Sequence, residues 1–236
     1  MKKIYQKEWF GIPFNSFSTL DSKRIAGGSF YDKFYNEFFR KFNSYTDLPG
    51  EWKEKKGLIA ESLLEQTKPE TKILSVGCGI GYIENILRSR NRDLTVIEPS
   101  LRATGFLEKN SNLKVYHGYF PGCLPENTGR FDLIYFVDTD YVFNQKELTA
   151  LMRSAYKYCD TLMFFSITGE DSWLLNFKEG LKSAASFLGL YARGQFWGYL
   201  RTVNDFCNCF HNSGYAQIKF GYLRKDVYWV KAKTCH

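Results

Sequence analysis

The sequence predicts an α/β domain built on a seven-stranded, mostly parallel sheet that ends in an antiparallel hairpin. From residue 72 onward, strand-sized apolar segments alternate with segments of helical periodicity, which is the pattern of βαβ units. The strand-like segments are near-continuous apolar runs, as expected when helices cover both faces of a parallel sheet. The last two strand-like segments are separated by the polar corner Arg224-Lys225, which is typical of a hairpin.

The chain length supports one such domain with additional covering segments. With 236 residues, the chain is long enough for a full α/β domain and short for two independent domains. The apolar fraction of 44% and the charged fraction of 24% exclude a disordered or coiled-coil protein. We expect an N-terminal substrate helix within residues 1–48, a main domain over residues 49–236, and a lid inserted at residues 169–200.

The first predicted element is an amphipathic helix that begins near residue 30. Phe30, Phe34, Phe38 and Phe42 recur at every fourth position, and Ser29 stands where an N-cap residue is expected. A second helix is expected over residues 51–66, after a Pro-Gly turn. The remaining strands and helices belong to the alternating part of the main domain, from residue 72 onward, and to the segment after the lid. Strands are expected at residues 72–76, 94–98, 113–117, 131–137, 161–168, 215–223 and 226–234, and helices from about residue 80, at 100–109, at 145–158 with Asn144 as its cap, and at 201–212.

The most specific motif is a glycine loop between the first of these strands and the helix after it. Gly77, Gly79 and Gly81 allow a tight turn and leave no Cβ between the loop and a ligand, while the helix N-terminus offers N–H donors. Glu98 ends the next strand, seventeen residues beyond Gly81, where an acid can accept hydrogen bonds from both ribose hydroxyls. The loop and the acid together predict nucleoside binding.

The spacing of the glycines decides between two kinds of nucleoside site. A dinucleotide fingerprint would need its third glycine at Tyr82, whereas the G-x-G-x-G spacing found here resembles motif I of the class I S-adenosylmethionine (SAM) dependent methyltransferases, which have a Rossmann-like fold. The resemblance covers residues 50–236 and includes the loop, the acid and the terminal hairpin in the same order.

This resemblance implies a set of contacts with SAM. Gly77, Cys78 and Gly79 would line its methionine part, and Glu98 would hold the ribose. The segment Gly118-Tyr119-Phe120 would frame the adenine. Two positions depart from many relatives, which have acids where Ser75 and Tyr119 stand. The residues expected to bind the cofactor are Gly77, Cys78, Gly79, Gly81, Glu98, Pro99, Tyr119, Phe120, Val137 and Tyr31.

Candidate catalytic residues follow the fourth strand of the main domain. Asp138 is the first choice for a general base, because ligands of such sheets bind at the carboxyl ends of the strands. Asp140 and Tyr141 are expected to contact the acceptor. For Asp138 and Asp140, a capping role or a hydrogen bond within the loop is an equally good explanation. His117 is a weaker candidate base. No metal site is expected, because the pair Cys207 and Cys209 lacks the spacing of metal motifs.

The N-terminal helix has a second, shorter resemblance. Its Tyr31-Asp32-Lys33-Phe34-Tyr35 segment is similar to the Y-D-x-F-Y segment of small-molecule methyltransferases, including sugar N-methyltransferases. The similarity implies that Tyr31, the second candidate catalytic residue besides Asp138, lies near the methyl group and that Tyr35 lies near the acceptor. The alternative is an aromatic stripe that only packs in the core. Trp173, Trp197, Tyr199 and Arg201 are expected in the lid, with Trp197 and Arg201 contacting the acceptor.

Charge and composition indicate what kind of partner to expect. The formal net charge is +7, and the basic excess lies in residues 1–56 and 169–236 while the centre is nearly neutral. This distribution favours a small, anionic acceptor, although solvated surfaces explain it as well. No basic run indicates a nucleic-acid tail, and RNA methylation is disfavoured. We expect a cytoplasmic protein with no membrane insertion, because the N-terminus lacks an apolar signal segment and no apolar run is long enough to span a bilayer. The sequence does not predict an oligomeric state.

The predicted function is therefore SAM-dependent transfer of a methyl group to an O or N atom of a small, anionic acceptor. A nucleotide sugar or a phosphorylated metabolite of surface-polysaccharide biosynthesis would suit the basic flanks. Two alternatives remain open: a nicotinamide-dependent Rossmann oxidoreductase or epimerase, and a non-catalytic binding protein with the SAM fold.

Overall fold

A seven-stranded sheet organises the chain in the computed structural model, which describes residues 2–17, 28–110, 113–167, 181, 185 and 195–234. The strands lie in the order β10-β11-β8-β7-β4-β5-β6. Their bounds are β4 Lys72–Val76, β5 Asp93–Glu98, β6 Lys114–His117, β7 Phe131–Val137, β8 Cys159–Ile167, β10 Tyr215–Arg224 and β11 Val227–Thr234. Each bound lies within two residues of its sequence prediction.

The direction of the strands confirms the predicted fold class. β4 pairs in parallel with both β5 and β7, and β6 and β8 continue the parallel arrangement outward. β11 is antiparallel to β8, and β10 is antiparallel to β11. The sheet is therefore a Rossmann-like α/β sheet that an antiparallel hairpin extends on one edge. The carboxyl ends of β4, β5 and β7 meet at the same edge of the sheet.

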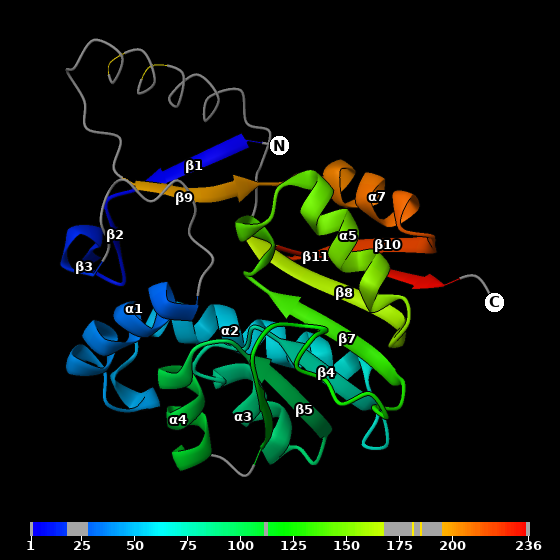
Figure 1. Cartoon of the computed structure of the whole chain (residues 1–236), viewed down its shortest axis with the longest axis horizontal. Helices are drawn as coiled ribbons and strands as arrows, with labels where there is room; N and C mark the ends of the chain where they lie inside the picture. Colours follow the sequence, from blue (N-terminus) through cyan, green and yellow to red (C-terminus); the bar gives the residue numbers. More distant parts are fainter. Residues whose placement is uncertain are drawn as a thin grey trace.

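Helices cover both faces of the sheet, as Figure 1 shows. α5 and α7 pack on one face, where the core includes the stacked rings of Phe136 and Phe164. α2 and α3 pack on the other face, around Tyr135 and Phe165. The alternation of neighbouring residues between the two cores explains why the strands are apolar on both sides. The helix bounds are α1 Gly28–Lys41, α2 Gly50–Gln66, α3 Tyr82–Ser89, α4 Leu101–Asn110, α5 Gln145–Ala155 and α7 Val203–Asn212.

Some predicted helix ends are wrong. Ser29 lies inside α1, which begins at Gly28, so it is not the N-cap. α5 ends at Ala155, three residues before the predicted Tyr158. α7 begins at Val203 because the Thr202 side chain accepts a hydrogen bond from the Asp205 N–H, which makes Thr202 its N-cap. The Asn144 cap of α5 is confirmed, since its side chain accepts from the Glu147 N–H.

The N-terminal residues form strands that were not predicted. β1 (Lys2–Gln6) pairs antiparallel with β9 (Gln195–Leu200), the described end of the predicted insertion. Figure 1 shows this two-stranded sheet apart from the main sheet. Trp173 lies outside the described residues, as does the side chain of Trp197.

A third hydrophobic core, rich in aromatic rings, joins α1 to the rest of the molecule. β2 (Glu8–Trp9), β3 (Ile12–Pro13) and the 3₁₀ turn η1 (Phe14–Ser16) lead the chain across α1. Trp9 stacks on Phe34 with their ring centroids 4.0 Å apart, and Phe39 stacks on Phe106 of α4 at 4.9 Å. The predicted aromatic stripe thus packs α1 between the N-terminal segment and α4.

Candidate active site

The glycine loop connects β4 to α3 at the carboxyl edge of the sheet. Gly79 and Gly81 have φ angles of +58° and +70°, a region that other residues rarely adopt. A Cβ on Gly81 would lie 2.0 Å from a methyl carbon of Leu107 in α4, and a Cβ on Gly79 would lie 2.7 Å from the Tyr35 hydroxyl oxygen. Glycine is therefore required both for the backbone of the loop and for the close approach of α4 and α1.

Glu98 at the end of β5 points to this loop, as predicted for the ribose ligand. Its side chain is 4% exposed, and Oε2 accepts a hydrogen bond of 2.7 Å from the Gly79 N–H. Oε1 accepts one of 2.9 Å from the Ser100 N–H. Burial raises the pKa of Glu98 to about 7, although both N–H groups oppose the shift. The carboxylate thus joins the glycine loop to the end of β5 and titrates near neutral pH.

Three phenols lie over the same loop. Tyr31 and Tyr35 come from α1, and Tyr141 comes from the 3₁₀ turn η3 (Asp140–Val142) that follows β7. The hydroxyl oxygens of Tyr31 and Tyr141 are 3.4 Å apart. Burial raises the pKa of all three phenols, and the negative charge of Glu98 raises those of Tyr31 and Tyr35 further. The structure therefore brings these predicted residues together with Gly79 and Glu98, and the phenols stay protonated at neutral pH.

The predicted base Asp138 has a cationic partner. Its Oδ2 lies 2.6 Å from the Nζ of Lys56 in α2, and its backbone φ is +49°. The Lys56 Nζ also lies 5.5 Å from the centroid of the Trp52 ring. The sequence analysis missed Lys56, because a lysine in a helix of alternating charges looks like a solvated residue. The role of Asp138 as a base stays a prediction.

Asp140 and Arg201 form a buried ion pair next to this group. Arg201 is 0% exposed, and its Nη1 lies 3.6 Å from Asp140 Oδ2. The guanidinium also donates to the backbone carbonyls of Asp140 and Phe143. Burial raises the pKa of Asp140 to about 6, against the effect of Arg201. The pair connects the end of β9 to η3, and the predicted contacts of both residues with the acceptor stay predictions.

Glu84 in the first turn of α3 is a buried acid that the sequence analysis missed. It is 2% exposed, and its Oε1 accepts hydrogen bonds from the Ser75 hydroxyl at 2.6 Å and the Tyr135 hydroxyl at 2.7 Å. Burial raises its pKa. Ser75 occupies the position where many relatives have an acid, and here a carboxylate reaches that position from α3. The sequence signal that could have revealed Glu84 is its position three residues before Leu87, which places both residues on the buried side of α3.

The remaining predicted cofactor contacts lie around the same edge of the sheet. Tyr119 is 55% exposed, and the ring of Phe120 packs edge-on against Phe136. The Pro99 carbonyl lies 3.1 Å from His117 Nε2. Val137 is half-buried at the end of β7, and so is Cys78, whose pKa is raised by burial of the thiol. These placements leave the predicted contacts with the cofactor as predictions.

Two features are absent from the part of the chain that the structure describes. Within it, no helix is both long and apolar enough to cross a membrane. Among the same residues, no group of three or more His, Cys, Asp and Glu side chains is arranged to hold a metal ion.

Comparison with known proteins identifies the family. A family model described as a methyltransferase domain matches residues 47–218, which is more than half of the chain. No curated protein sequence matches.

Solved structures show the same fold at low sequence identity. The magnesium protoporphyrin IX methyltransferase of Synechocystis, solved with bound S-adenosylhomocysteine (SAH), has a TM-score of 0.59 and 11% identity, over 94% of this chain and 92% of that one. The DhpI–SAH complex has a TM-score of 0.63 and 12% identity, over 88% and 94%. A SAM-dependent methyltransferase of Thermotoga maritima has a TM-score of 0.59 and 16% identity, over 87% and 98%.

These matches confirm the family that the glycine spacing indicated, and they favour it over the nicotinamide-dependent alternative. The chain belongs to the methyltransferase-domain family, and its fold is that of the class I SAM-dependent methyltransferases.

Proposed function

We propose that this protein binds SAM at the glycine loop and transfers its methyl group to an O or N atom of a small acceptor. The observation that carries the proposal is the 2.7 Å hydrogen bond between the Gly79 N–H and Glu98 Oε2, beneath the phenols of α1 and η3. It places a positive-φ glycine turn and an acid at a strand end next to each other, and both features suit an adenosyl ligand.

The residues present fit the donor. The glycines of the loop carry no Cβ, which lets a ligand approach the loop backbone, and the Tyr35 hydroxyl lies against Gly79 as a polar contact for that ligand. Each carboxylate oxygen has two lone pairs. Glu98 can therefore accept ribose hydroxyls while it keeps its bonds to Gly79 and Ser100.

The chain's own part in the reaction is alignment. SAM supplies an activated methyl group on a sulfonium when it is bound. Tyr31, Tyr35 and Tyr141 surround the loop with rings and protonated hydroxyls, which orient a polar acceptor and keep water out. The faces of these aromatic rings attract a cation such as the sulfonium.

We further propose that the acceptor is anionic, with a nucleotide sugar or a phosphorylated metabolite of surface-polysaccharide biosynthesis as the class to test first. The basic excess of the two flanks supports this choice. Lys56 is the cation nearest to the predicted base, since its ammonium lies 2.6 Å from Asp138. An anionic group that pairs with Lys56 would release Asp138 to accept a proton from the acceptor.

Calorimetric titration with SAM and SAH tests the proposal. Wild-type protein is expected to bind both. Glu98→Gln, which keeps the shape of the side chain but removes its charge, should weaken SAH binding about tenfold because hydrogen bonds to a charged acceptor contribute about 1.5–3 kcal/mol. Glu108→Gln on the exposed side of α4 is the matched control and should bind like wild type.

Two outcomes would contradict different parts of the proposal. Failure of the wild-type protein to bind either compound would remove the enzymatic function. Unchanged affinity in Glu98→Gln would remove the ribose assignment alone. Transfer of labelled methyl from SAM, measured on nucleotide sugars, sugar phosphates and matched neutral sugars, then tests whether the acceptor is anionic.

A further inference from the structure

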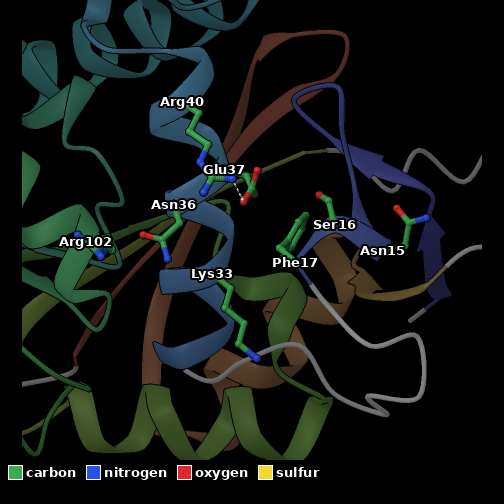
Figure 2. A pocket seen from close by; sticks show the side chains of 8 residues that line it. All are labelled: Asn15, Ser16, Phe17, Lys33, Asn36, Glu37, Arg40 and Arg102. Atoms are coloured by element: carbon green, nitrogen blue, oxygen red, sulfur yellow. Dashed lines mark hydrogen bonds and ion pairs between the residues drawn. The ribbon is translucent and has the colours of Figure 1, made fainter.

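A pocket lies on the outer side of α1, away from the glycine loop. This outer pocket has a volume of about 600 Å³. Figure 2 shows side chains of α1 in its centre, Arg102 of α4 on one side, and residues of the N-terminal segment on the other. It is lined by Asn15, Ser16, Phe17, Lys33, Asn36, Glu37, Arg40 and Arg102.

The spacing of residues in α1 separates the outer pocket from the donor site. Lys33, Asn36, Glu37 and Arg40 follow the i, i+3, i+4, i+7 pattern and so share one face of the helix. The opposite face carries Tyr35 and the other buried rings, which pack toward the glycine loop. A ligand in the outer pocket therefore has the helix between itself and the reacting methyl group.

The charges of the outer pocket are mostly positive. Lys33, Arg40 and Arg102 are cations. Glu37 is the one acid among the described lining residues, and its Oε1 lies 2.6 Å from Arg40 Nη1. Among the residues that the structure describes, no acid forms an ion pair with Lys33 or Arg102. The neighbouring Asp32 is also an anion, but its Oδ1 is held by the Ser100 hydroxyl and the Arg102 backbone N–H and not by either cationic side chain.

The other lining groups suit a phosphate-bearing ligand. The amides of Asn15 and Asn36 add neutral donors beside the cations, and Phe17 adds an apolar wall. A guanidinium binds two phosphate oxygens at once, which distinguishes a phosphate from a simple halide. The volume is within the range of pockets for small metabolites.

We propose that the outer pocket binds a phosphorylated small molecule, with Lys33 and Arg102 as its principal contacts. The ligand would link α1 to α4, the two helices that Asp32 already connects. Ser100, one partner of Asp32, donates its backbone N–H to Glu98. A bound phosphate would therefore strengthen the packing that holds Tyr35 against the glycine loop.

The test is a calorimetric titration of the full chain with inorganic pyrophosphate at constant ionic strength. We expect saturable binding of the wild-type protein, with a Kd of about 1 mM or lower. The double variant Lys33→Gln/Arg102→Gln should weaken it at least tenfold, because both charged hydrogen-bond donors are removed. Lys109→Gln, in the last turn of α4 and outside the pocket, is the control and should bind like wild type.

Three results would overturn the proposal. They are the absence of saturation in the wild-type protein, equal affinity in the double variant, and binding of a single-stranded RNA but not of pyrophosphate through the same two side chains. All substituted side chains are exposed, so thermal unfolding of the three proteins should coincide. Because the readout does not involve SAM, failure here leaves the proposed methyl transfer untouched.

Discussion

The two halves of the candidate active site are built from different parts of the chain. In the donor half, formed by β4, α3 and β5, Gly79 and Glu98 are 19 residues apart, and Ser75 and Glu84 are 9 apart. In the covering half, formed by α1, η3, β1 and β9, Tyr31 and Tyr141 are 110 residues apart, and Arg201 and Asp140 are 61 apart. The donor half is thus encoded by one continuous segment, whereas the covering half depends on contacts between distant segments.

The two halves also differ in the forces that hold them. The donor half relies on carboxylates that accept hydrogen bonds from backbone N–H groups and hydroxyls. The covering half relies on packed rings and on one buried ion pair. Substitutions in each half should therefore change different measured quantities.

The largest expected effect is a loss of stability in the covering half. Arg201→Met removes a fully buried guanidinium and leaves the buried Asp140 without its cation. We expect the free energy of unfolding to fall by about 3–5 kcal/mol near neutral pH. Denaturant unfolding measures the loss.

Asp140 itself provides the control. The double variant Arg201→Met/Asp140→Asn should recover part of the stability, because no buried charge remains. In the single variant, the Asp140 pKa in the folded protein exceeds its unfolded value, so the cost should shrink as the pH falls and the acid takes up a proton. A loss below about 1 kcal/mol would show that the pair does not hold β9 to η3.

The second-largest expected effect is a pH dependence of SAH affinity, which arises in the donor half. The Glu98 pKa is about 7, and ribose hydroxyls donate to the ionised carboxylate, so binding of SAH favours loss of this proton. Affinity should therefore rise with pH, by about tenfold between about pH 6 and pH 8. Titrations across this range measure it. Glu98→Gln should give a flat profile, and a wild-type profile as flat as the variant's would contradict the assignment.

The smallest effect lies where the two halves meet. Tyr35→Phe removes the hydroxyl that lies against Gly79 and keeps the buried ring. SAH affinity should fall about three- to tenfold, and stability should change by less than about 1 kcal/mol. Tyr222→Phe, at an exposed position of β10, is the control for removing a hydroxyl. If Tyr35→Phe bound SAH as tightly as wild type, the phenol would serve packing alone.

The difference between the halves explains what could be predicted from the sequence. All seven strands, the hairpin and the glycine loop depend on local periodicity and spacing, and the structure places them as predicted. Local patterns also placed Glu98 at the end of β5 and Asn144 at the start of α5.

The missed residues depend on contacts that periodicity does not reveal. Lys56 looks like a surface residue until α2 brings it to Asp138, and β1 (Lys2–Gln6) is too polar to be recognised as a strand without its partner β9. The buried partners of Arg201, one acid and two backbone carbonyls, also come from a distant segment of the chain, and its expected contact with the acceptor stays a prediction. The predicted helix ends were wrong for a different reason, because a single capping side chain, such as that of Thr202, determines where a helix begins.

The pairing of β1 with β9 sets an order of events during synthesis. β1 is synthesised before the main-sheet strands β4 to β8, whereas its partner β9 is synthesised only after them. The main sheet up to β8 can form earlier, from contacts between neighbouring segments. The covering sheet is therefore completed late, after the strand that carries the glycine loop is already paired on both sides.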